Sequence, residues 1–196
     1  MIKIGVIGDI GSGKSFVSKL LNYPVFNADK EVIKIYKKDK NCYKKLRKKF
    51  PKYVFSFPVK KKELGNAIIN NFKNIREISN IVHPLIKIRL KKFLEKYKKN
   101  RIVVLDIPLL LENKINEKEY VLVFVDAKKS DILKRLKKRP NYNSKTLKIL
   151  KKFQLPIEIK KKKANYIIKN NFKRLNLKKN VKLLKIKILK NERNSS

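Results

Sequence analysis

The sequence contains few of the features that mark secreted or membrane proteins. Its single cysteine, Cys42, cannot form a disulfide within the chain, and a lone cysteine is typical of proteins in a reducing cytoplasm. No stretch approaches the roughly 18 consecutive apolar residues that a membrane-spanning helix needs. Met1 leads directly into an apolar segment, without the basic region and cleavage site of a secretory signal. We therefore expect a cytoplasmic protein that has no membrane partner.

Acidic residues are scarce as well. The chain has 15 Asp and Glu residues against 54 Lys and Arg residues, and its formal net charge is +39 at pH 7. Because Lys and Arg neutralise phosphates, this charge suggests a basic, non-catalytic nucleic-acid-binding protein as one alternative. The lysines are spread along the whole chain, however, and tryptophan is absent, which is the composition that an A/T-rich coding sequence produces. We therefore expect no specific nucleic-acid partner.

The chain of 196 residues is long enough for one sizeable core. Short apolar segments alternate with stretches in which apolar residues recur at helical spacing. We expect strands at 2–7, 25–26, 101–107, 120–126 and 166–168. We expect helices at 14–22, 30–38, 63–82, 85–98, 129–139 and 144–153, and either a helix at 174–190 or a strand at 181–189. Buried strands separated by helices predict an α/β fold with a parallel sheet of about five strands, covered on both faces.

Glycine is rare too, yet three of the five glycines lie within residues 8–15, GDIGSGKS. Gly8, four residues, then Gly13-Lys14-Ser15 is the pattern of the phosphate-binding loop of nucleoside triphosphatases. Glycines let such a loop adopt positive φ and approach phosphate, so that backbone amides and the following helix start point at the anion. The expected strand precedes the pattern and the expected helix follows it. The sequence therefore predicts a triphosphate-binding loop.

The residue types of this loop have separate expected roles. Lys14 would reach the β- and γ-phosphates and act in catalysis, and the Ser15 hydroxyl would coordinate Mg²⁺. A loop of this kind indicates a bound triphosphate without naming the acceptor. The remaining residues that we expect to bind ATP within residues 8–16 are Gly8, Gly11, Ser12, Gly13 and Phe16.

Further segments follow this loop in a fixed order: FNADK (26–30), IVHPLI (81–86), LDIPLLLE (105–112), VFVDA (123–127), LKRLKKR (133–139), the Gln154 region and ANYIIKNN (164–171). With IGDIGSGKS (7–15) they resemble the dephospho-CoA kinase family, from residue 1 to about 172, with weak similarity over 37–75. The resemblance implies a three-layer α/β/α P-loop fold. It also implies that ATP phosphorylates the ribose 3′-hydroxyl of dephospho-CoA to give CoA and ADP, the last step of CoA biosynthesis.

A small P-loop kinase needs an acceptor site and a lid. We expect one domain whose core is 1–29, 101–127 and 164–190, with a helical acceptor region at 30–100 and a lid at 128–160 that excludes water on closing. A different P-loop kinase, acting on a nucleoside monophosphate or a small polyol, is the first alternative. The oligomeric state is left open.

Three carboxylates match the family's segments. Asp29 follows the second strand and would accept or orient the proton of the acceptor hydroxyl, as a catalytic and substrate-binding residue; the alternative is an N-cap for a helix that begins at Lys30. Asp106 ends the third strand, where it would hold the metal through water or merely cap the strand. Glu112 is assigned to substrate binding through the resemblance alone.

Basic and amide side chains complete the predicted site. Arg135 and Arg139 are four residues apart, so we expect them to share one helix face and to bind ATP, with Arg139 also catalytic; a solvated basic face is the alternative. Asn170 is expected to bind ATP, and Asn170 and Gln154 are expected near the adenine or the lid. His83 is expected to contact the acceptor, with Pro84 beginning a helix at 85.

The chain departs from the family's pattern at five positions. Asp9 and Phe172 stand where glycine is usual, Phe16 where threonine is usual, and Asn27 and Asn165 where aspartate is usual. The Asp9 carboxylate would repel phosphate unless it pointed out of the loop, and Phe16 has no hydroxyl for the α-phosphate. These departures leave open how tightly the chain binds nucleotide.

Overall fold

The computed structural model describes residues 1–108, 110–111, 120–140 and 142–193. The chain forms two compact units. We call Met1–Asn27, Tyr97–Tyr142 and Phe153–Ser196 the sheet unit, and Ala28–Lys96 with Asn143–Lys152 the helical unit. Glu112 lies outside the described residues, so its predicted role stays a prediction.

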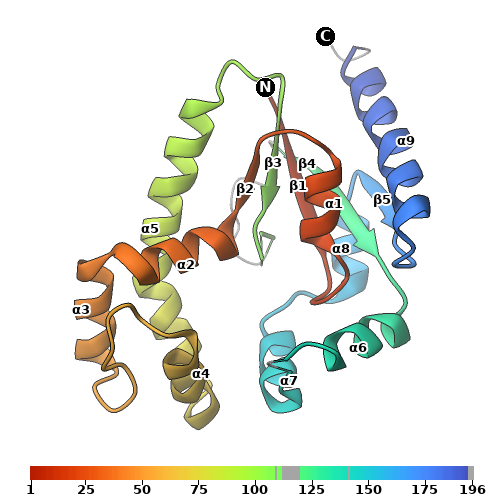
Figure 1. The fold of residues 1–196 in the computed structure, drawn as a ribbon. Coiled ribbons are helices and arrows are strands. Elements are labelled where there is room, and N and C mark those ends of the chain that lie inside the picture. Colours follow the sequence, from red (N-terminus) through yellow and green to blue (C-terminus); the bar gives the residue numbers. More distant parts are fainter. Residues whose placement is uncertain (109, 112–119, 141, 194–196) are drawn as a thin grey trace. The chain divides into compact units, whose positions relative to one another are not determined.

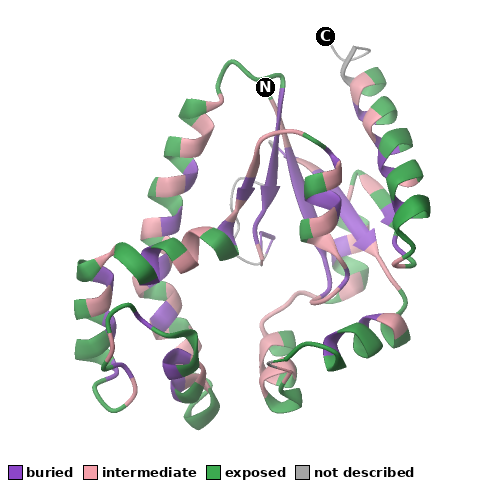
Figure 2. Cartoon of the chain, in the orientation of Figure 1, coloured by how far each residue is buried: buried purple, intermediate pink, exposed green. Residues whose placement is uncertain are grey.

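The sheet unit is built on five strands in the order β2-β3-β1-β4-β5, and every neighbouring pair is parallel (Figure 1). The strands are β1 (Ile2–Gly8), β2 (Val25–Asn27), β3 (Ile102–Asp106), β4 (Tyr120–Asp126) and β5 (Tyr166–Lys169). All five predicted strands are therefore confirmed. Strands β1, β3 and β4 are buried along most of their length, as Figure 2 shows, because helices cover both faces of a parallel sheet.

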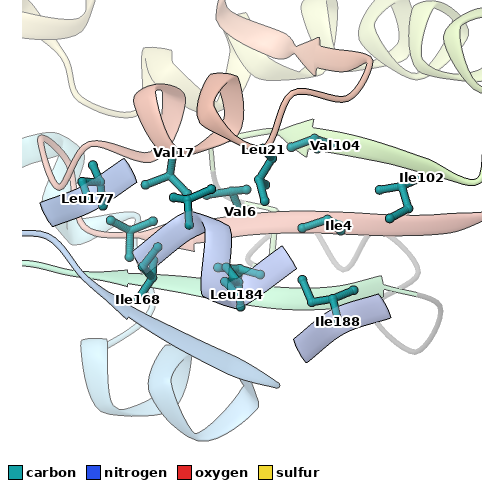
Figure 3. Packing of buried hydrophobic residues seen from close by; sticks show 13 residues of the cluster. Ile4, Val6, Val17, Leu21, Ile102, Val104, Ile168, Leu177, Leu184 and Ile188 are labelled. Carbon is teal, nitrogen blue, oxygen red and sulfur yellow. The ribbon is translucent and has the colours of Figure 1, made fainter. Parts of the chain in front are cut away.

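The described residues of the sheet unit include the helices α1 (Lys14–Leu20), α6 (Lys129–Lys137), α8 (Ile157–Lys163) and α9 (Arg174–Arg193). Helices α1 and α9 pack on one face of the sheet, where Val17 and Leu184 meet Ile4 and Val6 in the main apolar cluster (Figure 3). Neighbouring side chains of a strand point to opposite faces, so Ile7 faces the other side, where α8 lies. Residues 174–190 are thus helical, which settles the alternative that the sequence left open.

The helical unit contains α2 (Ala28–Lys38), α3 (Lys40–Lys49), α4 (Lys61–Asn70), α5 (Asn74–Lys96) and α7 (Ser144–Lys152). The short break between α2 and α3 has a local cause. The Asp39 carboxylate accepts a hydrogen bond of 2.8 Å from the Cys42 amide and so caps α3, as N-terminal aspartates do. Among the described residues, no helix is long and apolar enough to cross a membrane.

The expectation that Pro84 separates two helices is wrong. Helix α5 runs through Pro84 without interruption, and the break lies earlier, between α4 and α5. Proline keeps a helical φ and loses a single backbone hydrogen bond. The exposed position of Pro84 lets water reach the carbonyl that this bond would have satisfied. The buried stripe Ile78, Val82, Ile86 and Leu90 crosses the proline and holds the helix together.

Two other expectations about helices need correction. Helix α6 ends at Lys137, two residues earlier than expected, because Pro140 disfavours helical backbone at the preceding residue, Arg139. Arg139 therefore lies in the turn after the helix and does not share a helix face with Arg135. Helices α3 and α8 were not among the predicted elements, since their lysine runs carry little apolar periodicity.

Candidate active site

The glycine-rich loop connects β1 to α1, and its backbone explains its composition. Gly11 and Gly13 have φ angles of 85° and 99°, a left-handed conformation that other residues rarely adopt. A Cβ atom on Gly11 would lie 3.0 Å from the Leu136 side chain of α6, and one on Gly13 would collide with the side-chain amide of Asn170. The sequence explained these glycines by the close approach of phosphate. The structure adds a second reason: Gly11 and Gly13 pack so closely against Leu136 and Asn170 of the same chain that a side chain would not fit.

The Lys14 ammonium folds back over the loop. Its Nζ atom donates hydrogen bonds to the carbonyl oxygens of Gly8, at 3.1 Å, and of Asp9, at 2.9 Å. Ser15 is exposed in the first turn of α1. The loop thus presents a fixed cation and an accessible hydroxyl at the carboxyl end of β1, which is where ligands bind in parallel sheets.

The Asp9 side chain is not turned out to solvent. It is only 7% exposed, and its Oδ1 atom accepts a hydrogen bond of 2.7 Å from the Ile10 amide. Ser12 is fully buried, and its Oγ atom has no hydrogen-bond partner within the described part of the chain. The Asp9 carboxylate therefore takes the hydrogen bond of the Ile10 amide, so this amide of the loop is not available to a phosphate.

Asn170 ties the loop after β5 to the glycine-rich loop. It is 4% exposed, and its Nδ2 atom donates a hydrogen bond of 2.8 Å to the Ser12 carbonyl. Its Oδ1 atom accepts a bond of 2.9 Å from the Phe172 amide, and its own amide donates to the Asp126 carbonyl at 2.7 Å. Asn170 is thus a structural link as well as the ATP-binding candidate that the sequence suggested.

A cavity of about 860 Å³ opens beside Gly13 and Phe16, within the sheet unit. Phe172 lines it with an unusual backbone φ of 62°. The Arg135 guanidinium lies 5.2 Å from the centre of the Phe172 ring, and its Nη1 atom donates a hydrogen bond of 3.2 Å to the Gly11 carbonyl. Cavities of this size accept nucleotide-sized ligands, and this one combines an aromatic face with basic side chains.

The surroundings of Arg135 lower the pKa of its guanidinium. Partial burial, and secondly the positive charge of Arg139, lower the pKa of Arg135 below its ordinary value, although a guanidinium keeps its proton at neutral pH. Arg139 is exposed, and its amide donates to the Leu136 carbonyl at 3.0 Å. Both predicted arginines are therefore in the sheet unit, one against the loop and one in the turn that follows α6.

Asp106 ends β3 and is 2% exposed. Asn27, its register partner on β2, donates a hydrogen bond from Nδ2 to the Asp106 carboxylate. Asn165 fills the other Asn-for-Asp position, and its Oδ1 atom accepts from the Leu122 amide at 2.7 Å. Among the described residues no group of three or more His, Cys, Asp or Glu side chains could hold a metal ion, so any metal there would depend on few protein ligands.

Two of the predicted residues belong to the helical unit. Asp29 is exposed in the first turn of α2, where a carboxylate stabilises the positive end of a helix. It is not an N-cap of a helix that begins at Lys30, because α2 begins at Ala28. His83 is half-buried on α5, and burial, followed by the charge of Lys87, lowers the pKa of its imidazole.

Sequence reasoning missed Lys160 altogether. This residue of α8 is 3% exposed and lines a small cavity with Ile7, Gly8, Lys14 and Ile107. It is the first of four consecutive lysines, residues 160–163, and nothing in the composition or spacing of that run distinguishes it.

The similarity of this chain to known proteins decides its family. The family model described as dephospho-CoA kinase matches residues 2–175, which is most of the chain. The chain belongs to the dephospho-CoA kinase family. A dephospho-CoA kinase of Bartonella quintana (strain Toulouse) is 32% identical over 170 residues, which cover 84% of this chain and 87% of that protein.

Solved structures agree with the dephospho-CoA kinase family. The protein TT1252 from Thermus thermophilus superposes with a TM-score of 0.78 at 26% identity, over 96% of this chain and 97% of that one. The dephospho-CoA kinase from Campylobacter jejuni gives a TM-score of 0.69 at 26% identity, over 97% and 98%. The α/β P-loop fold expected from the sequence is therefore confirmed.

Proposed function

We propose that the chain transfers the γ-phosphoryl group of ATP to the ribose 3′-hydroxyl of dephospho-CoA, giving CoA and ADP. The observation that carries the proposal is the match to the dephospho-CoA kinase model over residues 2–175, in a chain that keeps Gly8, Gly13, Lys14 and Ser15 of the glycine-rich loop. The Lys14 ammonium above the Gly8 and Asp9 carbonyls supports the same reading.

ATP would bind mainly to the sheet unit. The amides of Gly11, Ser12 and Gly13 and the Lys14 ammonium would bind the β- and γ-phosphates. The base would enter the cavity beside Gly13, which is lined by Arg135, Phe172, Phe16 and Asn170. Arg139, in the turn after α6, would bind the transferring phosphoryl group, because a guanidinium offers several fixed donors.

A magnesium ion fits the donor set. Magnesium usually takes one or two protein oxygens, with phosphates and water completing its shell, and the Ser15 hydroxyl and the Asp106 carboxylate are donors of that kind. When bound, the ion supplies positive charge that offsets the charge of the β- and γ-phosphates. The Asn27 side chain, which donates to Asp106, would orient that carboxylate.

The acceptor would bind to the helical region 30–100, with Asp29 and His83 among its contacts and Glu112 as a further substrate ligand. The Asp29 carboxylate would accept the proton of the 3′-hydroxyl as the new oxygen–phosphorus bond forms. The bond between the γ-phosphorus and the β–γ bridging oxygen breaks, and ADP leaves. We also propose that residues 128–160 close as a lid and exclude water, in a cytoplasmic enzyme.

An ADP-release assay with Mg-ATP tests the reaction directly. Dephospho-CoA should support turnover, and mass spectrometry should identify CoA as the product, whereas nucleoside monophosphates and small polyols should not. Lys14→Ala should lower turnover by a factor of about 100 or more, and Lys19→Ala, an exposed lysine of the same helix, should not. The proposal would be overturned if a nucleoside monophosphate supported turnover and dephospho-CoA did not. It would also be overturned if the protein bound nucleic acid and showed no kinase activity.

Asp29→Asn tests whether the Asp29 carboxylate is the catalytic base that accepts the proton of the 3′-hydroxyl. The variant should lose a factor of about 100 or more in turnover while it binds Mg-ATP normally, because the lost group acts on the acceptor. Glu77→Gln, which removes a partly exposed carboxylate of the same unit that pairs with Lys49 at 3.1 Å, is the matched control. Unchanged turnover in Asp29→Asn would remove this residue from the mechanism.

A further inference from the structure

Lys160 differs from the other lysines of its run. It is 3% exposed, whereas Lys162 and Lys163 are exposed and Lys161 forms an ion pair of 3.5 Å with Asp126. A lysine almost always keeps its ammonium in water, and even a lysine with a long apolar contact extends its tip towards solvent. The fold therefore buries one lysine of the four and leaves its neighbours at least partly in water.

The surroundings of Lys160 include the glycine-rich loop. Helix α8 lies on the face of the sheet opposite α1 and α9, and Lys160 lines the same small cavity as Gly8 and Lys14 of the glycine-rich loop. Gly8 is the last residue of β1, and Ile107, also in the lining, directly follows the end of β3. Lys160 therefore lies at the carboxyl ends of the adjacent strands β1 and β3, and this is the edge where a parallel sheet binds its ligand.

Two lysines from different segments thus line one small cavity beside the loop. Lys14 comes from α1 and Lys160 from α8, and all residues concerned belong to the sheet unit. A polyphosphate is the anion that this pair of cations fits, because charge develops on the terminal phosphoryl oxygens during transfer. A cation that is already buried and positioned stabilises that charge more strongly than an exposed one, since less water screens it and nothing has to reorganise.

We propose that Lys160 is a catalytic residue whose ammonium contacts the terminal phosphoryl group of ATP held by the glycine-rich loop. This inference rests on the proposed kinase function. During transfer the acceptor oxygen bonds to the γ-phosphorus and the bond to ADP breaks, while Lys160 donates hydrogen bonds to the phosphoryl oxygens and exchanges no atom. ADP, which lacks that phosphoryl group, does not engage Lys160.

The test uses the full chain with Lys160→Met, Lys160→Arg and the matched control Lys162→Met, which removes an exposed lysine from the same helix and changes the net charge equally. Lys160→Met should lower turnover about 100-fold and weaken Mg-ATP binding about fivefold in calorimetry without an acceptor, while ADP binding changes by less than about twofold. Lys160→Arg should recover part of the lost turnover, and Lys162→Met should match the unchanged protein. Thermal unfolding should show that the Met variant is folded, since methionine fills a similar apolar volume.

Two results would overturn the assignment. One is ATP binding and turnover in Lys160→Met within about twofold of the unchanged protein; the other is an equal loss of ADP and ATP affinity, which marks a structural role. A Lys160→Met protein that does not fold leaves the decision to Lys160→Arg, through the same comparison of ATP with ADP. Failure of the proposed function is separate, because the binding measurements need no acceptor: an unchanged protein that binds ATP through Lys160 but phosphorylates no dephospho-CoA would refute that function alone.

Discussion

The side-chain amide of Asn170 donates a hydrogen bond of 2.8 Å to the backbone carbonyl of Ser12, so the loop after β5 is joined to the loop after β1. The same side chain also accepts the Phe172 amide. A single buried residue therefore sets the distance between the glycine-rich loop and one wall of the neighbouring cavity. Under the proposed function this relationship links stability to nucleotide binding, because both loops must keep their places for the cavity to keep its shape.

Asn170→Ala should damage stability and binding together. The change leaves the Ser12 carbonyl and the Phe172 amide without their partner, so the free energy of unfolding should fall by about 2 kcal/mol in urea titrations. The KM for ATP should rise severalfold. Asn171→Ala is the control, because this exposed neighbour accepts one bond, from the Lys173 amide at 3.1 Å. Equal stability of the two variants would refute the special role of Asn170.

Replacing Asp9 should strengthen nucleotide binding. In Asp9→Gly the loop loses a negative charge and regains the Ile10 amide that Asp9 now occupies. Calorimetry should show Mg-ATP binding tighter by a factor of about three to ten at low salt, with a smaller gain at high salt. Asp9→Asn separates the causes, since it removes the charge and keeps an acceptor for the amide. If neither variant binds ATP more tightly, the departure at this position has no electrostatic cost.

Phe172→Asn should separate backbone strain from ligand contact. Asparagine tolerates the left-handed backbone of this position, and relief of strain worth about 1 kcal/mol should offset the lost contact with Arg135. Unfolding should therefore change little. ATP affinity should fall about tenfold if the base contacts the ring, whereas inorganic tripolyphosphate should bind unchanged. Phe72→Asn, at a half-exposed phenylalanine of the helical unit, is the control, and an equal loss with tripolyphosphate would contradict a base contact.

The pKa of His83 can be measured directly, because it is the single histidine of the chain. Burial, then the charge of Lys87, keeps this pKa below its ordinary value, so the unfolded chain takes up a proton first as the pH falls. Stability should therefore be full above about pH 6.5 and decline as the pH drops from there towards the pKa of the folded protein. NMR titration of Lys87→Gln should show a higher His83 pKa that is still depressed, because burial is the larger cause. A shift as large in Lys91→Gln would contradict this assignment.

Local patterns were sufficient for much of the fold. The five strands and the glycine-rich loop follow from short apolar segments and from residue types that act within a few positions of each other. Segment ends were predicted less well. Pro84 continues a helix because the apolar stripe on both sides of it stays buried, and Arg139 leaves a helix because of the proline that follows it.

The sequence by itself determined the parallel sheet, the phosphate-binding loop and the resemblance to a kinase family, because these depend on periodicity and on residues close together in the chain. Only the tertiary structure decided that Asn170 is hydrogen-bonded to the glycine-rich loop and that α6 leaves no room for a side chain at position 11. It also decided that Lys160 is the buried one of four adjacent lysines and lines a cavity with Lys14. Each of these depends on segments more than a hundred residues apart meeting in space. No local pattern records such a meeting, because burial and contact arise from packing.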